Sequence, residues 1–150
     1  MLKVAIAAAA VAPAIQPASI AGATLGLSQP AYEQLLGKPY AIAKLEGNRG
    51  RLIFPKRKLT VEFPSNGKAD GIVTWNKAYR TAAGVGPCSP AAALTKAYGS
   101  SLKPFKFQGK VAAYRMGKLS FRVDGGRVAA VMLSAPSLSI FTLLNATECS

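Results

Sequence analysis

The chain contains no histidine, only two cysteines and only six acidic residues among its 150 residues. Without histidine, the most common general base and the most common zinc ligand are both missing. No two acidic residues have the spacing of a metal site or of a glycosidase pair. They are Glu33, Glu46, Glu62, Asp70, Asp124 and Glu148. A Gly-x-Ser-x-Gly motif is also absent. We therefore predict a protein that is not an enzyme and that holds no metal and no cofactor.

The shortage of acidic residues leaves a large positive charge. Nineteen lysines and arginines give a formal net charge of +13. Such an excess favours anionic partners, such as an acidic envelope polymer, anionic lipid, an acidic protein or nucleic acid. The alternative is a solvated basic surface that only keeps the protein soluble. Nucleic acid is the less favoured partner because the sequence shows no recognition helix and no stacking motif.

The N-terminus has the pattern of an export signal. Lys3 is followed by an apolar run over residues 4–12 and by two small-residue cleavage sites, Ala12-Pro13-Ala14 and Ala21-Gly22-Ala23. We predict a signal peptide over residues 1–14, with cleavage as late as residue 23 as an alternative. An uncleaved alanine-rich helix is the other alternative. The apolar run is too short to span a bilayer, so we expect a secreted or periplasmic protein without a transmembrane span.

The two cysteines, Cys88 and Cys149, are expected to form one disulfide bond, because exported chains usually pair their cysteines. Such a bond would attach the end of the chain to its second half. A free thiol and an intermolecular bond remain as alternatives. A catalytic cysteine is disfavoured because no histidine is present to activate it.

The sequence contains an internal similarity with a period near 60 residues. Leu25-Gly26-Leu27-Ser28 is matched by Val85-Gly86-Pro87-Cys88-Ser89, and Lys58-Leu59-Thr60-Val61-Glu62-Phe63 by Lys118-Leu119-Ser120-Phe121-Arg122-Val123. This period is typical of a duplicated small module. We predict an α+β fold of two tandem repeats, over residues 20–78 and 79–150. Each repeat supplies a short helix and antiparallel strands, and together they form one sheet with the helices on one face.

Start and stop signals place the helices. The first is expected to begin after Ser28, to accept Pro30 in its first turn and to end at Gly37. The second is expected to use Ser89 as its cap and to end at Gly99. Strands are expected at residues 40–45, 51–54, 59–63 and 69–75, and at residues 105–107, 111–115, 119–123 and 128–133.

Two of these strands alternate apolar and polar residues, which predicts one buried face and one face in water. In the strand over residues 59–63, Thr60 and Glu62 occupy the polar positions. In the strand over residues 119–123, Ser120 and Arg122 occupy them. We expect the sheet face that carries these four residues to be open.

The turn Leu25-Gly26-Leu27-Ser28 and the helix end Leu36-Gly37-Lys38-Pro39 resemble the module of a superfamily of small bacterial envelope proteins. That superfamily includes secreted β-lactamase inhibitor proteins and the small lipoprotein of the outer-membrane β-barrel assembly machinery. The tandem arrangement is similar to the inhibitor type. The resemblance implies two modules joined into one sheet with a concave binding face.

Basic residues gather near the turns of both predicted repeats, with aromatic residues nearby. We expect the two basic turns to occupy equivalent sheet ends and to form one positive rim, although ordinary core packing is the alternative for the aromatic residues. The candidate binding residues are Arg49, Arg51, Lys56, Arg57, Lys58, Arg115, Lys118, Tyr40, Trp75, Tyr79 and Tyr114. The function predicted from these features is a secreted or periplasmic, non-enzymatic binding module. It would contact a protein or an anionic envelope component through its open sheet face and basic rim. The alternative function is an inhibitor of a secreted enzyme.

Overall fold

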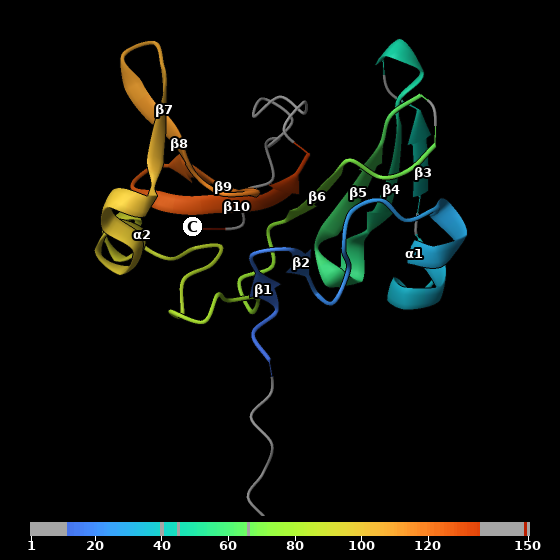
Figure 1. Ribbon diagram of the computed structural model, residues 1–150, viewed down its shortest axis with the longest axis horizontal. Helices are drawn as coiled ribbons and strands as arrows, with labels where there is room; N and C mark the ends of the chain where they lie inside the picture. Colours follow the sequence, from blue (N-terminus) through green and yellow to red (C-terminus); the bar gives the residue numbers. More distant parts are fainter. Residues whose placement is uncertain (1–11, 40, 45, 66, 136–148, 150) are drawn as a thin grey trace, which may run out of the picture.

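An antiparallel sheet of eight strands is the main element of the computed structural model, which describes residues 12–39, 41–44, 46–65, 67–135 and 149 (Figure 1). The strands are β3 (Ala41–Lys44), β4 (Gly50–Phe54), β5 (Leu59–Phe63), β6 (Gly71–Thr74), β7 (Lys103–Phe107), β8 (Lys110–Met116), β9 (Leu119–Asp124) and β10 (Arg127–Ser134). Their order across the sheet is β3-β4-β5-β6-β10-β9-β8-β7. The strands β6 and β10 therefore lie at the centre, and β3 and β7 form the edges. All eight predicted strands are present, and each overlaps its predicted range.

The other elements are short. The strands β1 (Ile15–Gln16) and β2 (Ser19–Ile20) form a separate two-stranded sheet. The helices are α1 (Gln29–Leu36) and α2 (Ala91–Tyr98), and three 3-10 turns are η1 (Glu46–Asn48), η2 (Pro55–Arg57) and η3 (Gly99–Ser101). The α+β class predicted from the sequence is thus confirmed.

Helix α1 begins and ends where its sequence signals predict. Ser28 is the N-cap residue, Pro30 lies in the first turn, and Gly37 ends the helix with a φ of 93°. For α2 the predicted cap is wrong, because Pro90 and not Ser89 occupies the cap position. The Ser89 hydroxyl is already engaged by the preceding loop, where it accepts hydrogen bonds from the Gly86 amide and from Arg80.

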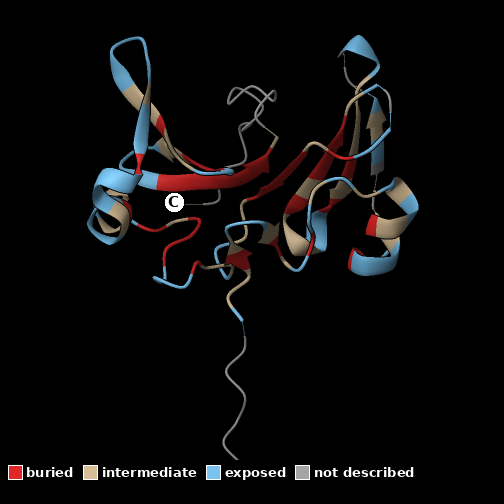
Figure 2. Cartoon of the chain, viewed as in Figure 1, coloured by how far each residue is buried: buried red, intermediate tan, exposed pale blue. Residues whose placement is uncertain are grey.

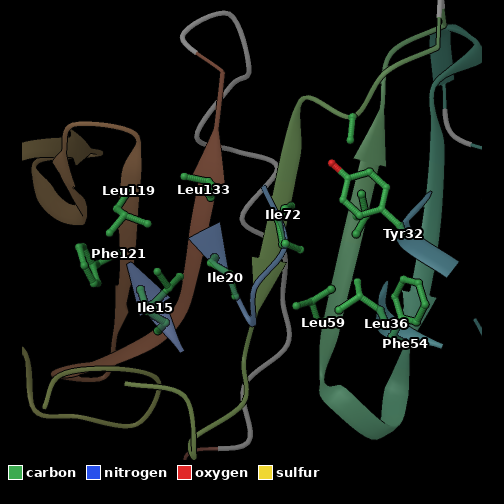
Figure 3. Close-up of a cluster of buried hydrophobic side chains, with 14 of the residues drawn as sticks. Ile15, Ile20, Tyr32, Leu36, Phe54, Leu59, Ile72, Leu119, Phe121 and Leu133 are labelled. Carbon is green, nitrogen blue, oxygen red and sulfur yellow. The ribbon is translucent and has the colours of Figure 1, made fainter. Parts of the chain in front are cut away.

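The larger of two buried hydrophobic clusters lies between the large sheet and the helices, and Val73, Ala130 and Met132 form the smaller one. Both helices and the β1–β2 pair lie on the same side of the sheet (Figure 1). In the close-up of Figure 3, Ile15 and Ile20 lie against the central strands, and Tyr32 and Leu36 lie against the part of the sheet that β4 and β5 form. Because short helices and two-residue strands are unstable alone, packing against this sheet is what maintains them.

The opposite face of the sheet is not open at its centre, so the expectation of an open face is wrong there. Figure 2 shows buried residues along the central strands, and Glu62 and Ser120 are both 0% exposed. Two arginines contribute to this burial. Arg51 donates to the Glu62 carboxylate, and Arg115 donates to the hydroxyls of Ser120 and Ser134. Glu62 and Ser120 are therefore buried under arginine side chains instead of facing solvent, whereas Thr60 and Arg122 are partly exposed.

Candidate anion-binding cleft

A cleft of about 690 Å³ lies where the end of α1 meets the turn between β4 and β5. We call it the basic cleft. It is lined by Leu36, Gly37, Lys38, Phe54, Pro55, Lys56 and Arg57. The first three residues come from the end of α1 and the rest from the end of β4 and from η2. Two segments that are distant in the sequence thus form one site.

The two walls of the basic cleft are joined by a hydrogen bond. Arg57 Nε donates to the Leu36 carbonyl oxygen at 2.9 Å. The last carbonyl groups of a helix have no partner within the helix and carry partial negative charge, so a guanidinium is a favourable partner for them. Arg57 therefore fixes the position of the basic turn relative to α1.

The same turn is also held from the side of β6. Asn76 Nδ2 donates to the Arg57 carbonyl at 3.0 Å. The Lys58 carbonyl accepts from the Trp75 amide at 3.1 Å and from Thr74 Oγ1 at 2.9 Å. Because the turn is fixed on both sides, its cationic side chains start from an ordered backbone, which lowers the entropic cost of binding.

The basic cleft combines an apolar floor with a cationic rim. Leu36 and Phe54 are buried core residues at the bottom of the cleft, and Figure 3 shows them close together at the α1 end of that core. Pro55 is exposed beside them. Lys38 and Lys56 are exposed, and Arg57 is half-buried. Within the described part of the chain, no acidic residue lines the cleft, and neither lysine has an ion pair or hydrogen bond. The arrangement suits a partner that carries both a negative charge and an apolar group.

Two of the predicted binding residues, Arg49 and Arg51, form ion pairs with carboxylates of the protein itself. Arg49 Nη2 donates to both carboxylate oxygens of Asp70, at 2.7 and 2.9 Å. Arg51 donates to Glu62 Oε1 through Nε at 3.2 Å and through Nη2 at 2.5 Å. Their charges are compensated by carboxylates, and they lie at the start of β4, away from the turn at its other end.

The two basic turns do not form one rim, so that expectation is wrong. Lys58 lies at the end of the sheet where its carbonyl meets the amide of Trp75, after β6. Lys118 lies at the end where its carbonyl accepts from the Ser134 amide, and Ser134 is the register partner of Gly71 at the start of β6. Gly71 begins β6 and Trp75 follows its last residue, so the two basic turns lie at opposite ends of β6. The positive charge is therefore divided between two separate places.

The aromatic candidates have different environments. Trp75 is partly exposed at the end of β6, next to the Lys58 backbone. Tyr79 and Tyr114 pack against the hydrophobic core, which confirms ordinary packing for these two. Tyr40 lies outside the described residues.

The predicted disulfide bond is present between Cys88 and Cys149, with a Cα–Cα distance of 5.2 Å. Among the described helices, none is both long enough and apolar enough to cross a membrane. The described residues also contain no group of three histidine, cysteine or acidic side chains that could hold a metal ion.

No protein-family model, no curated protein and no solved structure matches this chain. The cleft itself is therefore the main guide to function. The sequence singled out Lys56 and Arg57 but not Lys38, Leu36 or Phe54. Motif Leu36-Gly37-Lys38-Pro39 marks a helix end, and only the packing of that end against η2 makes it part of a site.

Proposed function

We propose that this protein is an exported, non-enzymatic binding module that contacts an anionic partner through the basic cleft. The observation that carries the proposal is the cationic rim of Lys38, Lys56 and Arg57 around an apolar floor, with no acidic residue among the described residues that line the cleft. Elsewhere, Glu62, Asp70 and Asp124 are each paired with an arginine.

The proposal includes an exported chain with a signal peptide that ends at or before residue 14. Its support is the burial of residues just after that point, because Ile15 is 1% and Ile20 is 0% exposed. The Ile15 amide also donates to the Arg80 carbonyl at 3.1 Å. Cleavage after residue 23 would remove these core residues, so the earlier site is favoured.

We also propose that the chain is a duplicated module of the kind that its sequence resembles. Each half contributes one helix followed by four strands in chain order. The last strands of the two halves, β6 and β10, pair with each other at the centre of the sheet. The arrangement is therefore symmetric in strand order, which supports a common origin of the halves.

Binding to immobilised polyphosphate in a salt gradient tests the anion-binding function. The double variant Lys38→Gln/Lys56→Gln is expected to elute at lower salt than the original protein, since surface ion pairs are screened by salt. The control is Lys106→Gln/Lys110→Gln, which removes the same charge from exposed positions on β7 and β8. It is expected to elute closer to the original protein.

Equal shifts for the two double variants would contradict a local site and indicate binding by net charge alone. An extract of the host cell envelope, applied to the immobilised protein, tests the alternative function. A single protein that stays bound at high salt would favour inhibition of a secreted enzyme, whereas anionic material released at moderate salt supports the proposal.

A further inference from the structure

We propose that the ligand of the basic cleft is a lipid with a phosphate headgroup. Its alkyl chain would lie along Pro55 above the buried Leu36 and Phe54, and its phosphate would contact Lys38, Lys56 and Arg57. This inference rests on the proposed function, because it names the class of anion that the same cleft binds.

The apolar part of the cleft favours a ligand with a hydrocarbon chain. Leu36, Phe54 and Pro55 supply apolar surface, and the aliphatic stems of Lys38 and Lys56 extend it. The cleft volume of about 690 Å³ lies in the range of sites that hold small organic molecules. An inorganic anion would contact only the charged groups of the rim and would leave the exposed apolar surface of Pro55 and of the lysine stems in water.

The backbone around the cleft favours an alkyl chain over an extended peptide. The Leu36 carbonyl already accepts a hydrogen bond from Arg57, and the Gly37 amide already donates one to the backbone carbonyl of Glu33. The Arg57 carbonyl accepts from Asn76, and Pro55 has no amide hydrogen. A peptide needs donors and acceptors for its own backbone, whereas an alkyl chain needs only apolar surface.

The charge on the rim favours an anionic headgroup over a zwitterionic one. Lys38, Lys56 and Arg57 place three cations around one opening, and no described acidic residue lines it. A phosphate can accept hydrogen bonds from several of these donors at once. The ammonium group of a zwitterionic headgroup would instead face like charge without a carboxylate partner.

Calorimetric titration with three soluble probes below their micelle concentrations tests the inference. The probes are dodecyl phosphate, inorganic phosphate and dodecyl maltoside. Dodecyl phosphate is expected to bind most tightly. In a series of octyl, decyl and dodecyl phosphate, affinity is expected to rise by up to about fourfold for each methylene that enters the cleft. Amide resonances of Gly37 and Phe54 are expected to shift on binding.

Variants link this binding to the cleft. Lys38→Gln/Lys56→Gln is expected to lose about tenfold in affinity for dodecyl phosphate, whereas Lys106→Gln/Lys110→Gln is expected to keep the original value. Circular dichroism checks that both variants are folded. Equal affinities of these two variants would overturn the assignment of the site.

The outcomes separate the two proposals. If dodecyl phosphate binds no more tightly than inorganic phosphate, while polyphosphate still distinguishes the cleft variant from its control, the lipid inference is wrong and anion binding stands. If dodecyl maltoside binds as tightly as dodecyl phosphate, the headgroup assignment is wrong. If neither the alkyl phosphates nor polyphosphate distinguishes the variants, both proposals are wrong.

Discussion

Removal of the Cys88–Cys149 disulfide bond is expected to lower the free energy of unfolding by about 4 kcal/mol. The bond joins residues that are 61 positions apart. It therefore closes a large loop in the unfolded chain, and the entropy lost by that chain grows with the logarithm of loop length. In the folded protein, the Cys88 amide donates to the Val128 carbonyl at 2.7 Å, so the bond attaches the chain end beside the start of β10.

This loss is large relative to the total stability of a domain, which is typically about 5–15 kcal/mol. The loss is measured by urea unfolding of the variant Cys88→Ala/Cys149→Ala, with circular dichroism as the signal. The original protein treated with dithiothreitol is the control, because it loses the bond but keeps both side chains. Agreement between the variant and the reduced protein assigns the effect to the bond. An unfolding free energy equal to that of the oxidised protein would refute the reasoning.

Three further predictions concern the core. Arg51→Met is expected to destabilise the protein by about 3–5 kcal/mol in urea unfolding, because it leaves the Glu62 carboxylate buried and unpaired, and Arg51→Lys should recover part of the loss. Burial raises the pKa of Tyr32 above its ordinary 10.0, so the folded state keeps the phenol proton longer than the unfolded state does. The contribution of Tyr32 to the free energy of unfolding is therefore fully present below pH 10, and it is lost as the pH rises from 10 through the raised pKa of the folded state. The difference between the original protein and Tyr32→Phe in urea unfolding should therefore shrink from pH 9 to pH 11, and a constant difference would contradict this. A chain that starts at Thr24 is expected to lose at least about 4 kcal/mol in urea unfolding relative to one that starts at Ile15, because it lacks two buried isoleucines; equal stabilities would show that the segment is dispensable.

Alternation of side chains predicted the strands well, because burial on one face requires a period of two. In β5, Leu59, Val61 and Phe63 all face the core, as their spacing indicates. Helix ends were predictable where a residue has one clear role. Gly37 takes a φ of 93°, which glycine adopts at low cost. The failure of Ser89 to cap α2 was not predictable, because its hydroxyl accepts hydrogen bonds from a loop whose path the sequence does not reveal.

The site was predictable only in part, because its contacts depend on strand register and on tertiary packing. The sequence placed Lys58 and Lys118 in equivalent turns, but the antiparallel pairing of β6 with β10 puts these turns at opposite ends of the sheet. Similarly, the spacing of Glu62 predicts a solvent-facing position. Its burial follows from Arg51, which is its register partner on β4.

Arginines and lysines have different roles in this protein, and this difference explains why the net charge alone did not predict where the site lies. Each of the seven arginines of the chain has a hydrogen bond or ion pair within the protein. They are Arg49, Arg51, Arg57, Arg80, Arg115, Arg122 and Arg127. The planar guanidinium can donate to two acceptors in fixed geometry, which suits it to positions between strands and at helix ends. Lys38 and Lys56 have no such partner in the described part of the chain, so their ammonium groups are available to a ligand. The arginines thus stabilise the fold, and the lysines supply most of the charge that a partner meets. Only at Arg57 do the two roles coincide, because its guanidinium both ends α1 and borders the basic cleft.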